Sequence, residues 1–181
     1  IDRLVIRKTA ELVKKDASPG NGNSSFFFIN LSGASIADEN LFEYITQVFI
    51  ETGVSPSQFC FEITETAAIE NFSRATTIIK KLKEIGCTFA LDDFGNGFTS
   101  FAYLKSLRVD YLKIDGSYVQ DILEDPIDLA LVMAVNDIGH VMGMKTIAEF
   151  VQSEEVRAKL EEIGVDYCQG YFFSQPRPLI G

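Results

Sequence analysis

The chain has 181 residues, 46% of them hydrophobic, and its 26 acidic against 16 basic residues give a net charge of −10. This length and hydrophobic content suffice for one globular domain with a buried core, and they exclude a disordered chain. The charge excludes unspecific binding to a nucleic-acid polymer, because that binding depends on Lys and Arg side chains that neutralise phosphates.

The pattern of apolar residues and turn formers predicts helices that alternate with strands. In chain order it predicts a helix over 1–15, a turn at 18–25, a strand at 26–31, a helix around 41–49, a strand at 59–63, a helix over 75–85, a strand at 88–92, a short helix near 99–107, a strand at 111–115, a long helix over about 126–141, a strand at 145–149, a helix over 153–164 and a strand at 166–170. Such alternation indicates βα units and a largely parallel sheet. No G-x-G-x-x-G follows any strand, so a dinucleotide-binding fold has no support.

Every predicted strand carries a polar or charged residue at or near its C-terminal end, namely Asn30, Glu62, Asp92, Lys113, Glu149 and Gln169. In a (β/α) barrel, catalytic groups come from the C-terminal ends of several strands. An open doubly wound sheet binds its ligand mostly near one switch point. The pattern therefore favours an α/β fold of the TIM-type (β/α)8 barrel, here incomplete with about six of eight strands, the other two being expected before residue 1.

The strand-end residues carry mostly negative charge. Glu62, Asp92, Asp93 and Glu149 contribute −4 and Lys113 returns +1. Converging carboxylates repel one another and burial raises their pKa values, so either some are protonated or a cation lies among them. Carboxylate and amide oxygens suit Mg²⁺ or Mn²⁺. The only histidine, His140, lies in a predicted helix, which excludes a His-rich zinc site within this segment.

Each of these residues, taken alone, also has a structural interpretation. Asn30 and Gln169 could be hydrogen-bonding residues at strand ends, and Glu62, Glu65 and Lys113 could be ion-pair partners or helix caps. It is the joint pattern that favours a site.

The odd number of cysteines without paired spacing predicts reduced thiols and a cytoplasmic location. No run of about 20 apolar residues occurs, so no membrane contact is expected from this segment, although the parent protein could still be membrane-attached.

Six motifs carry a resemblance to a known family, and they are INLS (29–32), FEITET (61–66), LDDFGNGFTS (91–100), LKID (112–115), TIAE (146–149) and QGYFFSQP (169–176). Their order and approximate spacing resemble the EAL domain, a family of bacterial cyclic di-GMP phosphodiesterases and their degenerate, ligand-sensing relatives. The resemblance spans nearly the whole chain. It implies a TIM-type barrel that hydrolyses cyclic di-GMP to linear pGpG in second-messenger signalling.

The resemblance also implies residue roles. The metal ligands for two Mg²⁺ or Mn²⁺ ions would be Asn30, Glu62, Asp92, Asp93 and Glu149. The catalytic residues would be Lys113 near the attacking water, Glu65, which steadies the loop after the paired aspartates, and Gln169, which supports the site. Substrate-binding roles would fall to Asn30, Asp92 and Gln169. Two divalent ions about 3.5–4 Å apart can activate a water and stabilise charge on the phosphoryl group.

The chain departs from the family pattern in two places. The Glu-Ala-Leu motif is absent, so residues 1–181 are expected to be an EAL-type domain without its N-terminal strands, and this fragment alone is expected to bind metal weakly and show little activity. The usual Ala-Glu-Gly-Val-Glu reads AEFVQ, with Phe150 and Gln152 in place of Gly and Glu. The expected partners are cyclic di-GMP, a second copy in a homodimer, and fused sensory or diguanylate-cyclase-like domains.

Two alternative functions stay open at this point. One is a catalytically inactive cyclic di-GMP receptor or regulatory module. The other is an unrelated barrel metalloenzyme in which Lys113 acts as a base on a carbonyl substrate. The six motifs disfavour the second alternative.

Overall fold

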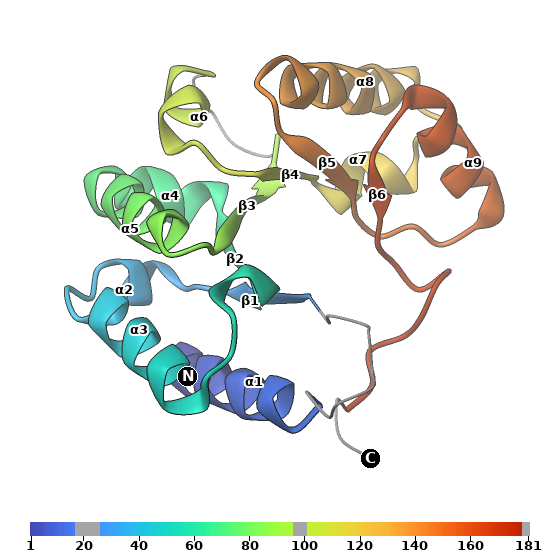
Figure 1. The fold of residues 1–181 in the computed structure, drawn as a ribbon. Helices are drawn as coiled ribbons and strands as arrows, with labels where there is room; N and C mark the ends of the chain where they lie inside the picture. The colour runs from blue at the N-terminus through green and yellow to red at the C-terminus, as the bar shows by residue number, and fades with distance from the viewer. Residues whose placement is uncertain (17–25, 96–100, 179–181) are drawn as a thin grey trace. The chain divides into compact units, whose positions relative to one another are not determined.

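The computed structural model describes residues 1–16, 26–95 and 101–178 (Figure 1). The predicted turn at 18–25 and residues 96–100 of the loop after the paired aspartates lie outside these residues. The strands are β1 (Phe27–Asn30), β2 (Phe59–Thr64), β3 (Thr88–Phe94), β4 (Tyr111–Ile114), β5 (Lys145–Ala148) and β6 (Tyr167–Cys168). The helices are α1 (Asp2–Asp16), α2 (Gly33–Ile36), α3 (Leu41–Thr52), α4 (Glu65–Glu70), α5 (Phe72–Glu84), α6 (Phe101–Leu107), α7 (Gly116–Gln120), α8 (Pro126–Val141) and α9 (Glu154–Ile163), with a 3-10 turn at Pro56–Gln58.

The six predicted strands and six predicted helices are confirmed within a few residues. The structure adds three short helices, α2, α4 and α7, which the sequence pattern missed because a helix of four to six residues shows no apolar period. The prediction that the third strand ends at Asp92 was wrong, since β3 continues to Phe94. Each strand is hydrogen-bonded to the strands before and after it in the sequence, so the order in the sheet is β1-β2-β3-β4-β5-β6. The pairs β1–β2, β4–β5 and β5–β6 are parallel, as predicted.

The chain divides into two compact units. The first unit comprises residues 1–90 with 99–109, and the second comprises 91–98 with 110–181. Strand β3 begins in the first unit and ends in the second. In the described part of the chain, no helix has the length and apolar character needed to cross a membrane.

The core of the first unit includes a contact between aromatic rings of β2 and of α3, the helix that precedes β2 in the chain. β1 and β2 pair in register from Phe27 opposite Phe59 to Asn30 opposite Glu62. The Phe59 ring is fully buried, with its centroid 4.9 Å from that of Phe49 on α3. Helix α1 packs against α3 and β1. Because of the register of β1 and β2, the polar residues Asn30 and Glu62 lie next to each other toward the C-terminal side of these two strands.

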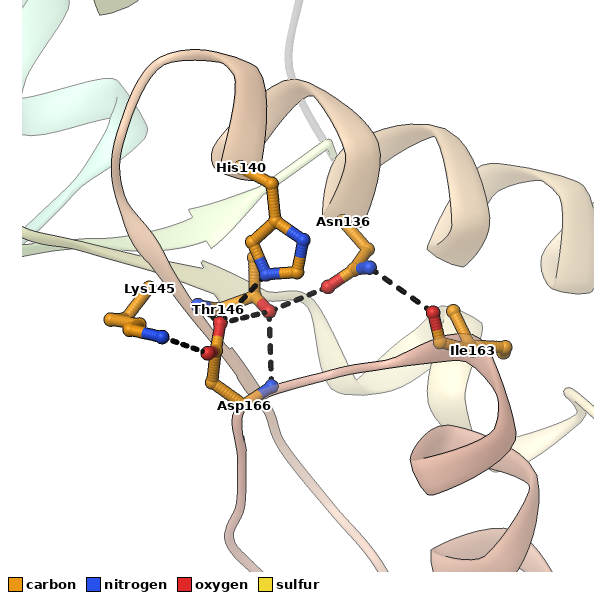
Figure 2. Close-up of polar contacts among 6 residues, drawn as sticks. All are labelled: Asn136, His140, Lys145, Thr146, Ile163 and Asp166. Atoms are coloured by element: carbon orange, nitrogen blue, oxygen red, sulfur yellow. Dashed lines mark hydrogen bonds and ion pairs between the residues drawn. The ribbon is translucent and has the colours of Figure 1, made fainter.

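The second unit is held at the N-terminal side of its strands by a polar network around Asp166 (Figure 2). Helix α8 packs on β4 and β5. The Asp166 carboxylate accepts hydrogen bonds from His140 Nε2 on α8 at 2.8 Å, from Lys145 Nζ at 2.5 Å and from the backbone N–H of Thr146 at 2.9 Å. One side chain thereby ties α8, the start of β5 and the approach to β6 together, which gives His140 a structural role.

Candidate functional site

Three carboxylates of the second unit gather where β3 and β5 end. One oxygen each of Asp92, Asp93 and Glu149 lies within 4.8 Å of the other two. Asp92 lies on β3, and Glu149 follows the last residue of β5. Because hard divalent cations are bound by carboxylate oxygens, the donor set of this cluster fits Mg²⁺ or Mn²⁺.

The backbone of Asp93 explains how two adjacent acids reach one cluster. Successive residues of a strand normally point to opposite faces. Asp93 has a φ of 56°, in the left-handed region, where few residues other than Gly, Asn and Asp occur. The Asp93 backbone N–H donates to Asp92 Oδ1 at 3.1 Å. The alternation is broken inside β3, so the two carboxylates come together although the strand continues to Phe94.

Lys113 joins two acids of the cluster. Its Nζ donates to Asp92 Oδ1 and to Glu149 Oε1, both at 2.8 Å, and the residue is only 3% exposed. Lys113 lies on β4, between the strands that carry its two partners. The structure therefore brings four of the predicted site residues together, and the geometry is compatible with both an ion pair and a group that acts on a ligand.

The electrostatics of the cluster favour a bound cation. Burial raises the pKa of Glu149 to about 7; Lys113 opposes this rise, and the charge of Asp92 adds to it. Burial also raises the pKa of Asp93, with further contributions from Asp92 and Asp115. When all are ionised, three carboxylates and one ammonium leave a net charge of −2. A divalent cation would offset that charge and lower both pKa values.

Two residues that the sequence interpretation did not single out form hydrogen bonds with the segment after the paired aspartates, and one of these bonds runs from Asp115 N to Phe94 O at 3.4 Å. Asp115 is buried and caps α7, because its Oδ1 accepts from Ser117 N at 2.8 Å and from Ser117 Oγ at 2.6 Å. Tyr118 donates its hydroxyl hydrogen to the carbonyl oxygen of Gly95 at 2.7 Å. Asp115 was visible as the last residue of LKID. It was missed because the interpretation took Lys113 as the polar residue at the end of this strand.

Gln169 lies beside Glu149 in the same unit. Both residues line a pocket of about 300 Å³. The backbone of Gln169 donates to Ala148 O at 2.8 Å and accepts from Val151 N at 3.0 Å, so the segment after β6 is fixed against the segment after β5. This position is consistent with the predicted supporting role of Gln169, which stays a prediction.

The remaining predicted site residues belong to the first unit. Asn30 and Glu62 are register partners on β1 and β2, and Glu62 is 5% exposed. Glu65 is 3% exposed and stands in the first turn of α4, next to the N-cap Thr64, whose hydroxyl oxygen accepts from Ala67 N. A carboxylate at that position also interacts favourably with the helix dipole. The metal-binding and loop-steadying roles of these residues stay predictions.

Known proteins resemble this chain in sequence over nearly its whole length. The EAL domain family model matches residues 1–176. Cyclic di-GMP phosphodiesterase PdeB of Shewanella oneidensis is 44% identical over 179 residues, which are 99% of this chain and 21% of that protein. Cyclic di-GMP phosphodiesterase PdeF of Escherichia coli is 34% identical over 180 residues, 99% of this chain and 24% of that protein. The chain thus spans about a fifth to a quarter of these relatives.

Solved structures resemble the chain in fold. The PaMucR phosphodiesterase in its c-di-GMP complex matches with a TM-score of 0.91 and 26% identity, over 98% of this chain and 71% of that one. The FimX EAL domain from Pseudomonas aeruginosa bound to c-di-GMP matches with a TM-score of 0.88 and 29% identity, over 97% of this chain and 69% of that one. EAL domains are TIM-type barrels, so the predicted fold class is confirmed. By the family model and by these relatives, the chain belongs to the EAL domain family.

Proposed function

We propose that this chain is part of a metal-dependent phosphodiesterase that hydrolyses cyclic di-GMP to linear pGpG. The observation that carries the proposal is the cluster of Asp92, Asp93 and Glu149 with Lys113 between two of its members. Similar proteins named cyclic di-GMP phosphodiesterases, and solved EAL domains that bind c-di-GMP, support the choice of substrate.

The residues of the second unit would hold the cation through the oxygens of Asp92, Asp93 and Glu149. Asn30 and Glu62 are further proposed ligands, on the strength of the family resemblance. Bound Mg²⁺ or Mn²⁺ supplies an activated water and offsets charge on the phosphoryl oxygens. Without such a cation, the net charge of the cluster would repel the anionic phosphodiester.

Lys113 contributes a fixed positive charge at the cluster. Its ammonium group is held by two carboxylates at 2.8 Å and is nearly inaccessible to solvent, so its position is well defined. A buried cation beside the reacting phosphodiester stabilises negative charge more strongly than an exposed one, because the local dielectric constant is lower. We therefore assign Lys113 to charge stabilisation and to orienting the nucleophile.

The proposal is tested by incubating the intact protein with cyclic di-GMP and Mg²⁺ or Mn²⁺ and following pGpG by chromatography. We expect pGpG to form, to disappear with a chelator, and to fall by at least 100-fold in the Asp92→Asn variant, which is in the range known for losing one preorganised electrostatic group. Binding of cyclic di-GMP without pGpG from the unaltered protein would contradict hydrolysis.

A cyclic di-GMP receptor without activity is the second candidate. The observation that favours it is Gln152, a neutral amide where the family usually has a glutamate. Calorimetry shows whether cyclic di-GMP binds, and chromatography shows whether it is hydrolysed. A receptor binds cyclic di-GMP and leaves it unchanged after prolonged incubation with either metal. A protein that does not bind cyclic di-GMP would contradict both candidates.

A further inference from the structure

The backbone at the end of β3 has an unusual conformation. Asp93 and Gly95 both have positive φ values, 56° and 109°, on either side of Phe94. A positive φ costs Asp93 energy because of its Cβ, whereas glycine adopts it freely. Strained residues persist where the surrounding structure enforces their conformation. The place of the Asp93 carboxylate in the acidic cluster therefore depends on contacts that the end of β3 receives from other elements.

Helix α7 makes two hydrogen bonds to this segment. The Tyr118 hydroxyl donates to Gly95 O at 2.7 Å, and the N–H of the N-cap residue Asp115 donates to Phe94 O at 3.4 Å. The second bond is long and therefore weak, whereas 2.7 Å is the usual distance for a hydroxyl donor. Of the two bonds, the one from Tyr118 is thus expected to hold the segment more strongly.

The Tyr118 ring also packs against the Gly95 backbone. A Cβ built on Gly95 would lie 2.9 Å from Cε2 of Tyr118, closer than two carbon atoms normally approach. The ring therefore occupies space that only glycine leaves open. The hydroxyl and the ring of Tyr118 act on the same residue, which lies two positions after Asp93.

Helix α7 is itself fixed within the second unit. It packs against α8, and its residue Val119 has no exposed surface. A Cβ built on Gly116 would lie 2.1 Å from Cδ2 of Phe150, so the Phe150 ring lies directly against the backbone at the start of α7. Tyr118 is therefore attached to an element that is held in place by contacts other than those with β3.

We propose that Tyr118 is a positioning residue for the metal site. Through Gly95 it holds the end of β3 in the conformation that brings the Asp93 carboxylate to Asp92 and Glu149. This inference rests on the proposed function, because it concerns the same cluster of carboxylates. Its hydroxyl is bonded to a backbone carbonyl, so Tyr118 acts through the position of Asp93 and not as a ligand. If the binding conformation is populated only in part, the apparent affinity for the cation falls by that fraction.

The test uses Tyr118→Phe in the intact protein, which keeps the ring and removes only the hydroxyl. Its affinity for Mn²⁺, measured without nucleotide from the electron paramagnetic resonance signal of free Mn²⁺, should fall about 2- to 10-fold, the effect of losing one ordinary hydrogen bond. Its unfolding temperature with a chelator present should stay within about 5 °C of the parent value. Tyr167→Phe is the matched control, because it removes a hydroxyl from an exposed tyrosine on β6 of the same unit and should leave the Mn²⁺ affinity unchanged.

Gly95→Ala tests whether Tyr118 acts through Gly95. The added methyl group would meet the Tyr118 ring, so this variant should weaken Mn²⁺ binding at least as much as Tyr118→Phe does. In the double variant the loss should be smaller than the product of the two single losses, because both changes break the same contact. Parent-like Mn²⁺ affinity of Tyr118→Phe, or single losses that simply multiply, would overturn this inference and leave the proposed function standing. Failure of the parent to bind Mn²⁺ would overturn both.

Discussion

At the scale of single residues, Lys113 has the most demanding position in the candidate site. Its ammonium group is buried between Asp92 and Glu149. Burying one cation with two acids is tolerable only while the pairing is complete, because each unpaired charge would be costly in this environment. Its partners on β3 and after β5 are therefore stabilised by Lys113 when no divalent cation is present.

We expect Lys113→Ala to lower the free energy of unfolding by about 3–5 kcal/mol in the presence of a chelator, because one buried and one partly buried carboxylate lose their partner. Mg²⁺ or Mn²⁺ should restore more stability to this variant than it adds to the parent chain. Urea unfolding with and without the metal measures both effects. Lys80→Ala is the control, since its pair with Glu84 is exposed and should be worth less than about 0.5 kcal/mol. Equal metal effects in variant and parent would argue against a cation site at this cluster.

At the scale of secondary-structure elements, Asp166 connects α8, β5 and the start of β6 (Figure 2). Burial alone would raise the pKa of its carboxyl group, but hydrogen bonds from Lys145, from the backbone of Thr146 and from His140 outweigh burial and hold that pKa well below its usual range. For an acid with a lowered pKa in the folded state, the stabilisation is present above the unfolded pKa and is lost as the pH falls toward the folded value.

We therefore expect Asp166→Asn to lower stability by about 1–2 kcal/mol at pH 7, the range for charge-assisted hydrogen bonds after allowing for solvent screening. The difference between variant and parent should shrink as the pH falls below about 4, the usual value for an aspartate. Urea midpoints at several pH values measure this. The control is Glu162→Gln, whose exposed pair with Lys159 should matter little. A difference that is constant from pH 7 to pH 3 would contradict the ionic contribution of Asp166.

The packing of α8 on the strands gives a second prediction at this scale. A Cβ on Gly139 would lie 2.7 Å from Cγ2 of Thr146, a residue with no exposed surface. Alanine is the better helix former by about 1 kcal/mol, but overpacking costs about 1–3 kcal/mol, so Gly139→Ala should be destabilising overall. Combined with Thr146→Ser, which removes only the methyl group, the loss should nearly vanish. Thermal unfolding of the two single variants and the double variant decides this.

At the scale of the whole molecule, the sequence predicted what depends on apolar period and motif order. The parallel strands, the longer helices and the polar residues at strand ends all followed from the pattern along the chain. The left-handed backbone of Asp93 and the extension of β3 to Phe94 did not, because alternation cannot reveal a local break inside a strand. The contact of Phe150 with Gly116 was equally hidden, since it joins residues 34 positions apart that share no motif. The sequence marked only the position of Phe150, because Phe stands there in place of the Gly of the family's Ala-Glu-Gly-Val-Glu.

The last prediction concerns residues 1–181 as a separate molecule. The chain covers 71% of the PaMucR phosphodiesterase chain and lacks a Glu-Ala-Leu motif. The resemblance to the family implies that the glutamate of this motif is a metal ligand. With one carboxylate fewer, a hard cation should bind more weakly. We expect residues 1–181 alone to form pGpG at less than about 1% of the rate of the intact protein, in line with losses of 10²-fold or more when one electrostatic group is removed.

Side-by-side assays at equal concentration, with metal varied from micromolar to millimolar, test this expectation. Circular dichroism of both samples is the control, because an unfolded fragment would also be inactive. The informative result is a folded fragment that turns over slowly and gains activity as the metal concentration rises. Turnover by the fragment comparable to that of the intact protein would show that the carboxylates of residues 1–181 suffice for the reaction, and it would contradict the role assigned to the Glu-Ala-Leu glutamate.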